Sequence, residues 1–160
     1  MKAQFINPFI TSATEVLQTE CHVTVHRDGK PSLSTQAIAS QEVTAIIGVT
    51  GKLEGVAVYS MSYDTALALF SEMMGEPVSE FDDLARSAIG ELGNMITGRA
   101  ATLLEKEGYS SDLSPPTIVE GKGTTIRTLE LPKIVLRLNT EKGAVELNVG
   151  LREAPGAPIL

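Results

Sequence analysis

The chain has 160 residues, of which 42% are hydrophobic, and this length and composition predict one domain with a single core. A formal net charge of −7, with 13 scattered lysines and arginines, argues against a nucleic-acid-binding protein and against attachment to an anionic membrane. The chain has no signal-peptide-like start, no apolar run long enough to span a bilayer, and a single cysteine, Cys21. We therefore expect a cytoplasmic protein.

The N-terminal half is predicted to contain two helices separated by strands. Apolar residues recur at helical spacing after Asn7-Pro8, a cap followed by a first-turn proline, so a first helix is expected over residues 7–19. Residues 21–60 are dominated by β-branched residues, and Gly51-Lys52 separates two such runs as a tight hairpin turn. Helical periodicity returns after Ser62 and stops at Gly75.

The longest predicted helix spans residues 79–106, with a capping box formed by Ser79 and Asp82. A Ser/Pro-rich loop over residues 110–116 comes next. Two alternating runs, 134–139 and 145–151, then form a hairpin with one wet face. This order lacks βαβ alternation and predicts an α+β fold, in which helices pack on one face of an antiparallel β-sheet. Residues 1–153 form the domain, and residues 154–160 are expected to fray.

The longest helix has two distinct faces when Ser87 is set at zero and each residue adds 100°. Mainly apolar residues between about 60° and 180° are predicted to face the core: Phe81, Leu84, Ala85, Ala88, Leu92, Met95, Ile96 and Leu103. A narrow second stripe lies within about 40° of zero: Ser87, Glu91, Asn94, Gly98 and Ala101.

Gly90, Gly93 and Gly98 lie in or beside the second stripe, although an exposed glycine inside a helix costs about 1 kcal/mol relative to alanine. Missing side chains let another backbone or a bulky group come close, which favours a docking surface. Packing against a neighbouring element of the same domain is the alternative.

Glu91 and Asn94 are one helical turn apart, which places their Cβ atoms about 5–6 Å from each other. The amide both donates and accepts hydrogen bonds and can orient a water molecule, while the carboxylate can pair with a cation on a docked molecule. By itself, this spacing is more typical of solvated surface.

The pattern Ser87-x3-Glu91-x2-Asn94 followed by Gly98 resembles the signature of the CheC/CheX/FliY chemotaxis phosphatases. Other segments resemble CheX in particular, so the resemblance covers most of the chain: residues 6–10, 51–56, 60–62, 74–76, 98–108 and 121–123. The resemblance implies an aspartyl-phosphate phosphatase that acts on a CheY-like response regulator. The regulator would supply Mg²⁺ and a lysine, and the chain would need no cofactor of its own.

By the same resemblance, Asn94 would orient the attacking water and Glu91 would pair with the regulator's lysine. We expect the partner-binding surface around them to comprise Ser87, Gly90, Gly98 and Ala101, with no chemical role assigned to Ser87. The resemblance also implies a homodimer, built partly by sheet edges. The alternative is a non-catalytic CheX-like domain that binds a signalling protein or serves as a dimerisation module.

A degenerate second copy of the motif occurs on the first helix, as Thr11-x3-Glu15-x2-Gln18. It suggests an old internal duplication with a pseudo-twofold relation, and solvated amphipathic surface is the alternative. Because glutamine is one methylene longer than asparagine, we predict that this copy is inactive.

Two further features of the sequence are not assigned to a functional site. Cys21, His22 and His26 could suggest a metal, but the two histidines would lie about 13 Å apart along a strand, so no metal site is expected. Arg99 falls on the predicted core face, where its stem is expected to run along apolar surface with its head in water.

Overall fold

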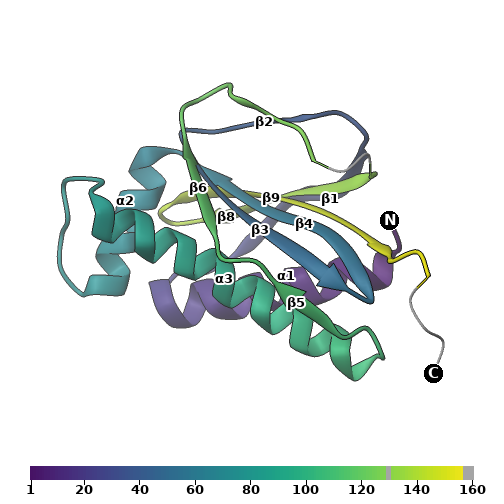
Figure 1. The fold of residues 1–160 in the computed structure, drawn as a ribbon. Coiled ribbons are helices and arrows are strands. Elements are labelled where there is room, and N and C mark those ends of the chain that lie inside the picture. Colours follow the sequence, from purple (N-terminus) through teal and green to yellow (C-terminus); the bar gives the residue numbers. More distant parts are fainter. Residues whose placement is uncertain (129–130, 157–160) are drawn as a thin grey trace.

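Three helices cover one face of an antiparallel sheet in the computed structural model, which describes residues 1–128 and 131–156 (Figure 1). The helices are α1 (Ala3–Cys21), α2 (Tyr63–Met74) and α3 (Asp83–Lys106). α1 and α3 lie side by side beneath the sheet, with α2 packed against both. The predicted α+β class, with helices on one face of an antiparallel sheet, is therefore confirmed.

The main sheet is seven-stranded, and its strand order is β1-β8-β9-β4-β3-β5, with β6 also paired to β3. Its strands are β1 (His26–Ser34), β3 (Val43–Gly51), β4 (Leu53–Met61), β5 (Ser111–Leu113), β6 (Thr117–Glu120), β8 (Lys133–Thr140) and β9 (Gly143–Glu153). A separate pair, β2 (Ile38–Ala39) and β7 (Thr125–Ile126), lies over the face opposite the helices.

Both predicted hairpins are present. Gly51 has a φ of +123° and turns the chain from β3 into β4, where Val49 pairs with Gly55. The second hairpin joins β8 to β9, and Leu136 pairs with Leu147 at its centre. These alternating apolar side chains point toward the helices and form the main core. A smaller cluster of Ile38, Val56 and Val58 lies on the other face, where it covers part of the β3–β4 hairpin.

The first helix is longer than predicted. It begins at Ala3, with Pro8 inside it, whereas the sequence suggested that Asn7-Pro8 would start it. A proline there removes the bond that residue 8 would donate to the carbonyl of residue 4. Phe5, Pro8 and Phe9 are all buried, so packing outweighs this loss.

The third helix is shorter than predicted at its start. Asp82 is itself the N-cap and its carboxylate accepts a hydrogen bond from the Ala85 N–H at 3.0 Å, so Ser79 lies outside the helix. The predicted loop over residues 110–116 contains the short strand β5. Its register, Val49 to Leu113, comes from pairing with a distant strand and has no local signal.

The strands are arranged similarly at the two ends of the sheet. Hairpins β3–β4 and β8–β9 meet at the centre through β4 and β9, and β6 flanks β3 as β1 flanks β8. An internal duplication predicts such an arrangement, and the pseudo-twofold repeat stays a prediction. The outer edge of β1 has no strand partner within residues 1–128 and 131–156, and the homodimer stays a prediction.

At the C-terminal end, the Ala154 N–H donates a hydrogen bond to the Lys52 carbonyl at 2.9 Å. Residue 154 is therefore tied to the β3–β4 turn, and residues 157–160 of the predicted frayed tail lie outside the described residues. Among the described helices, none combines the length and apolarity that crossing a membrane requires.

Candidate functional site on helix α3

α3 presents a different side to the core than the apolar pattern suggests. Its buried residues lie between about 140° and 300° on the wheel used above: Ala85, Ile89, Gly90, Leu92, Gly93, Ile96, Thr97, Ala100 and Leu104. Ala85, Leu92 and Ile96 are buried as predicted, but the centre of the buried side is rotated by about 100° from the centre of the predicted core face. Leu84 is 57% exposed, and Met95 and Ala88 are only half-buried.

Two glycines explain the rotation of α3. A Cβ added at Gly93 would lie 3.0 Å from Ile47 Cδ1 and 3.2 Å from Tyr59 Cδ2, and one at Gly90 would lie 3.3 Å from Pro116 Cγ. The helix therefore seats its glycine side directly on the sheet and on the segment before β6. Gly90 is buried against its own domain, so its assignment to the partner-binding surface is wrong, and the packing alternative holds for Gly90 and Gly93.

Packing within the domain does not require a glycine at position 98. The nearest atom to a Cβ added there is Leu113 Cδ1 at 4.0 Å, an ordinary contact distance, and the residue is half-buried. Of the three glycines beside the stripe, this one leaves space that an outside group can use.

A buried hydrogen bond fixes α3 beneath the stripe. The hydroxyls of Tyr59 on β4 and Thr97 lie 2.7 Å apart, and Thr97 also donates to the Gly93 carbonyl at 2.8 Å. Burial raises the pKa of Tyr59, so its hydroxyl keeps its proton for this bond. The middle of α3 is thereby held in one rotational setting.

The predicted pair lies on the opposite, solvent-facing side. Glu91 is exposed and Asn94 is half-exposed, with Ser87 exposed one turn earlier and Ala101 half-buried toward the helix end. Within residues 1–128 and 131–156, neither the Glu91 carboxylate nor the Asn94 amide has a hydrogen-bonding or ion-pair partner. Both groups are thus available to a docked molecule, one to pair with a cation and the other to hold a water.

Glu91 and Asn94 lie on the solvent-facing side of a helix, apart from two cavities in the domain. A cavity of about 470 Å³ is lined by Thr35, Arg127 and Lys133, and a groove of about 390 Å³ by Thr11, Glu15 and Arg27. Neither includes a residue of α3. Small-molecule sites usually bury most of their ligand in a pocket, so an exposed helix face better suits a reactive group carried on another protein.

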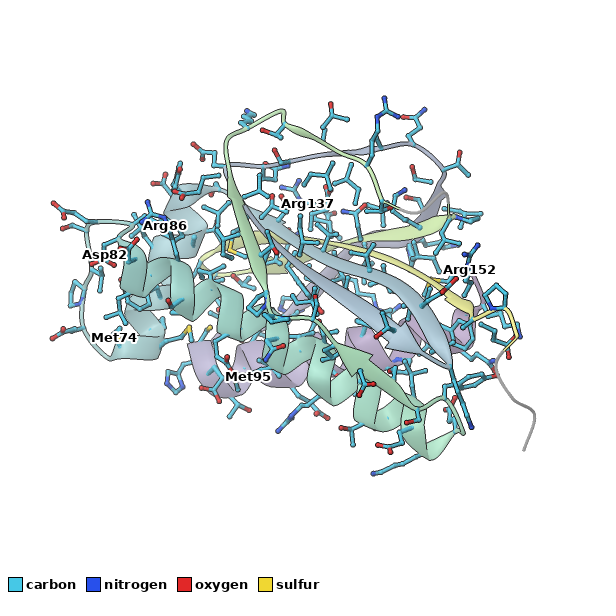
Figure 2. The ribbon with its side chains drawn as sticks, in the orientation of Figure 1. Met74, Asp82, Arg86, Met95, Arg137 and Arg152 are labelled. Carbon is cyan, nitrogen blue, oxygen red and sulfur yellow. The ribbon has the colours of Figure 1, made fainter. Side chains whose placement is uncertain are left out.

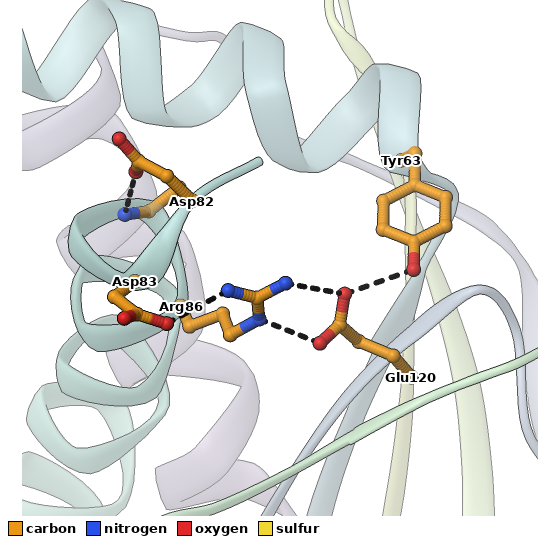
Figure 3. A network of polar contacts seen from close by, with 6 residues as sticks. Tyr63, Asp82, Asp83, Arg86 and Glu120 are labelled. Carbon is orange, nitrogen blue, oxygen red and sulfur yellow. Dashed lines mark hydrogen bonds and ion pairs between the residues drawn. The ribbon is translucent and has the colours of Figure 1, made fainter. Parts of the chain in front are cut away.

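The start of α3 is tied to two other elements by a polar network that the sequence did not suggest (Figure 3). Arg86 Nε donates to Glu120 Oε2 at 2.6 Å and Arg86 Nη1 to Asp83 Oδ1 at 2.9 Å. The Tyr63 hydroxyl donates to Glu120 Oε1 at 2.9 Å. Hydrogen bonding from Arg86 lowers the pKa of Glu120, and the bond to Glu120 raises that of Tyr63. α3 is therefore joined to β6 and α2 just before the stripe begins.

The degenerate copy on α1 differs in one important contact. Thr11, Glu15 and Gln18 are exposed, as the spacing predicts. However, the Glu15 carboxylate accepts a hydrogen bond from Arg99 Nη1 of α3 at 2.9 Å, and each side chain is 54% exposed. Arg99 lies outside the buried side of α3, so its predicted place on the core face is wrong.

The cysteine and histidines set aside above do not lie on one strand. Cys21 ends α1, His22 follows it with a φ of +53°, and His26 begins β1. Burial, with the nearby charges of Glu20 and Glu72, raises the pKa of Cys21 to about 12, so its thiol stays protonated. Among the residues that the structure describes, no three His, Cys, Asp or Glu side chains converge as metal ligands.

Comparisons with known proteins agree with this architecture. Residues 43–139 match the family model described as chemotaxis phosphatase CheX. The CheY-P phosphatase CheX of Thermotoga maritima is 39% identical over 137 residues, which cover 82% of this chain and 88% of that protein.

Solved structures give the same result. The chemotaxis protein CheX from Vibrio vulnificus superposes with a TM-score of 0.85 at 29% identity, covering 94% of this chain and 100% of that one. The CheX–CheY–BeF3–Mg²⁺ complex from Borrelia burgdorferi matches with a TM-score of 0.77 at 26% identity, covering 93% of this chain and 98% of that one.

Proposed function

Because the chain belongs to the CheX family of chemotaxis phosphatases, we propose that it hydrolyses the phosphoaspartate of a CheY-like response regulator at the Glu91–Asn94 face of α3. The observation that carries the proposal is that this carboxylate and amide, one turn apart on a firmly anchored helix, have no partner in the part of the chain that the structure describes.

Asn94 has the position and chemistry to orient the attacking water. Its carboxamide oxygen accepts a hydrogen bond from the water and its N–H group donates one, which together fix the water in line with the phosphorus. The water oxygen forms a bond to phosphorus while the bond between phosphorus and the aspartate oxygen breaks. The products are inorganic phosphate, which carries the proton lost by the water, and the free aspartate of the regulator.

An acyl phosphate is already reactive, so positioning the water can supply most of the acceleration, much as a glutamine orients water in GTPases. No general base of altered pKa is needed, which agrees with a pair that lies in solvent before docking. The charge of the phosphoryl group is balanced on the regulator, by Mg²⁺ and a lysine. The similar Borrelia burgdorferi complex contains CheY and Mg²⁺.

Glu91 is the docking member of the pair. It is exposed, its carboxylate has no partner within residues 1–128 and 131–156, and it can form a charge-assisted hydrogen bond with the regulator's lysine. That contact sets the distance between Asn94 and the phosphoryl group, so Glu91 contributes to binding and to rate.

The test measures phosphate release from acyl-phosphorylated CheY-like regulators of the source organism, with wild type, Asn94→Ala and Glu91→Ala. We expect Asn94→Ala to abolish acceleration while binding to the BeF3-loaded regulator stays within about threefold. Glu91→Ala should weaken both binding and rate, by about tenfold each, as loss of a charge-assisted contact does.

Thermal unfolding of each variant provides the control, since both side chains lack internal partners and their removal should leave the Tm unchanged. If wild type binds the regulators without changing their decay, the chain is the non-catalytic CheX-like binding domain. If Asn94→Ala retains full acceleration, another residue positions the water.

A further inference from the structure

We infer that Leu84 is an apolar docking contact for the regulator, two helical turns from Glu91, and that it orients the regulator along α3. The inference rests on the proposed function and adds to it a residue and a direction of docking.

Leu84 lacks cover from its own domain. Its side chain is 57% exposed, and it is absent from the buried core and from the partly buried residues packed against that core. The nearby aromatic ring of Phe81 is engaged elsewhere, edge-on to Tyr63 at 5.5 Å between centroids and under the Arg86 guanidinium at 5.6 Å.

An exposed leucine is not unusual in itself, and its position is what matters here. Leu84 precedes Glu91 by seven residues, which places it about 10 Å along the helix and about 20° around it. Gly98 follows Glu91 at the same interval, so Leu84, Glu91 and Gly98 form one row. Ser87, Asn94 and Ala101 form the row beside it.

A protein docked over Glu91 must also cover Leu84. A specific interface buries about 800 Å² on each partner, equivalent to a disc of about 16 Å radius. Leu84 lies inside such a disc centred on the catalytic pair. Figure 2 shows Asp82 and Arg86 at the same end of α3, where they flank this position in the sequence, and both side chains are engaged within the chain.

The two ends of the exposed face of α3 therefore differ in chemistry. Its N-terminal end offers an exposed apolar side chain, its centre the free Glu91 and Asn94, and its C-terminal end the open space at Gly98. The matching regulator carries an apolar surface patch about 10 Å from its phosphoaspartate, and that patch lies over the start of α3.

The first test compares the kinetics of Leu84→Ala with those of Leu33→Ala. Leu33 is a matched control because it is 64% exposed on β1, at the opposite edge of the sheet from β5 and β6. Leu84 contacts the regulator equally before and during hydrolysis, so Leu84→Ala should raise KM about tenfold with kcat within about twofold. Leu84→Met should restore most of the binding, and Leu33→Ala should change neither constant.

A second test measures contact directly and does not depend on turnover. Cys21 is fully buried, so Leu84→Cys introduces an accessible thiol without competition from it. Saturating BeF3-loaded regulator should slow maleimide labelling of this thiol at least tenfold, whereas labelling of Leu33→Cys should not change.

The outcomes separate this inference from the proposed function. If wild type accelerates phosphate release but Leu84→Ala has a wild-type KM, or regulator leaves labelling of Leu84→Cys unchanged, then Leu84 is not a docking contact and the proposed function stands. If wild type accelerates release from none of the regulators, the proposed function and this inference both fail.

Discussion

α1 and α3 lie side by side and carry the same motif spacing, yet they differ in what their acidic residues contact. Glu91 on α3 is exposed and has no partner among the described residues, whereas Glu15 on α1 is paired with Arg99 of α3. The α1 motif also ends in Gln18 where α3 has Asn94. A motif spacing therefore specifies which side chains share a helix face, but availability to a partner depends on what the neighbouring helix places beside them.

The most direct comparison of the two helices gives α3 the amide of α1. Asn94→Gln lengthens the side chain by one methylene, and a misplacement of about 1 Å can cost about 100-fold in rate. We expect kcat for regulator dephosphorylation to fall about 100-fold with little change in KM. A rate within threefold of wild type would show that the length of this amide is no reason to predict an inactive α1 copy.

The next comparison removes each motif in turn. The double variant Glu91→Ala, Asn94→Ala should show no acceleration, and Glu15→Ala, Gln18→Ala should stay within about twofold of wild type because Glu15 is already occupied by Arg99. Phosphate release measured under identical conditions decides this. Activity retained by the first double variant and lost on adding Glu15→Ala would mean that α1 carries the active copy.

Substitution of Gly98 and of Gly93 by alanine should change the free energy of unfolding in opposite directions. Gly98→Ala gains helix propensity without a clash and should raise the free energy of unfolding by about 1 kcal/mol. Gly93→Ala gains the same propensity but presses on buried Ile47 and Tyr59, at a packing cost of about 1–3 kcal/mol, so a net loss of about 1 kcal/mol is expected. Urea titrations of both variants measure these changes.

The KM of Gly98→Ala then tests whether the regulator occupies the space at Gly98. If the regulator approaches closely there, Gly98→Ala is more stable than wild type yet has a higher KM. An unchanged KM would remove Gly98 from the docking face.

The smallest expected effect concerns the network at the start of α3. The pKa of Glu120 is lowered in the folded state, chiefly by hydrogen bonding from Arg86, so its contribution is present above the pKa of an ordinary carboxyl and is lost as pH falls through the folded value. Wild type should therefore be modestly more stable than Glu120→Gln at pH 7, and the difference should shrink below about pH 4.5. Equal unfolding midpoints at pH 7 would show that the network contributes nothing measurable.

Much of the fold could be predicted from local signals. Hairpin turns at Gly51 and Gly143, the stop of α2 at Gly75, and the alternation in β8 and β9 all depend on residues close together in the chain. β5 could not be predicted in this way, because its strand conformation comes from pairing with the edge of β3. α1 was underestimated because burial of the residues around Pro8 outweighs the local preference to begin a helix there.

The sequence by itself determined that Ser87, Glu91 and Asn94 share one side of a helix, because a period of 3.6 residues follows from the backbone alone. Only the tertiary structure decided which side of α3 faces the core. The apolar pattern pointed to Leu84 and Met95, but close packing at Gly90 and Gly93 rotates the helix and leaves Leu84 exposed two turns before Glu91. Tertiary packing likewise joined Arg99 to Glu15 and left Glu91 free, since contacts between distant segments depend on how the helices meet.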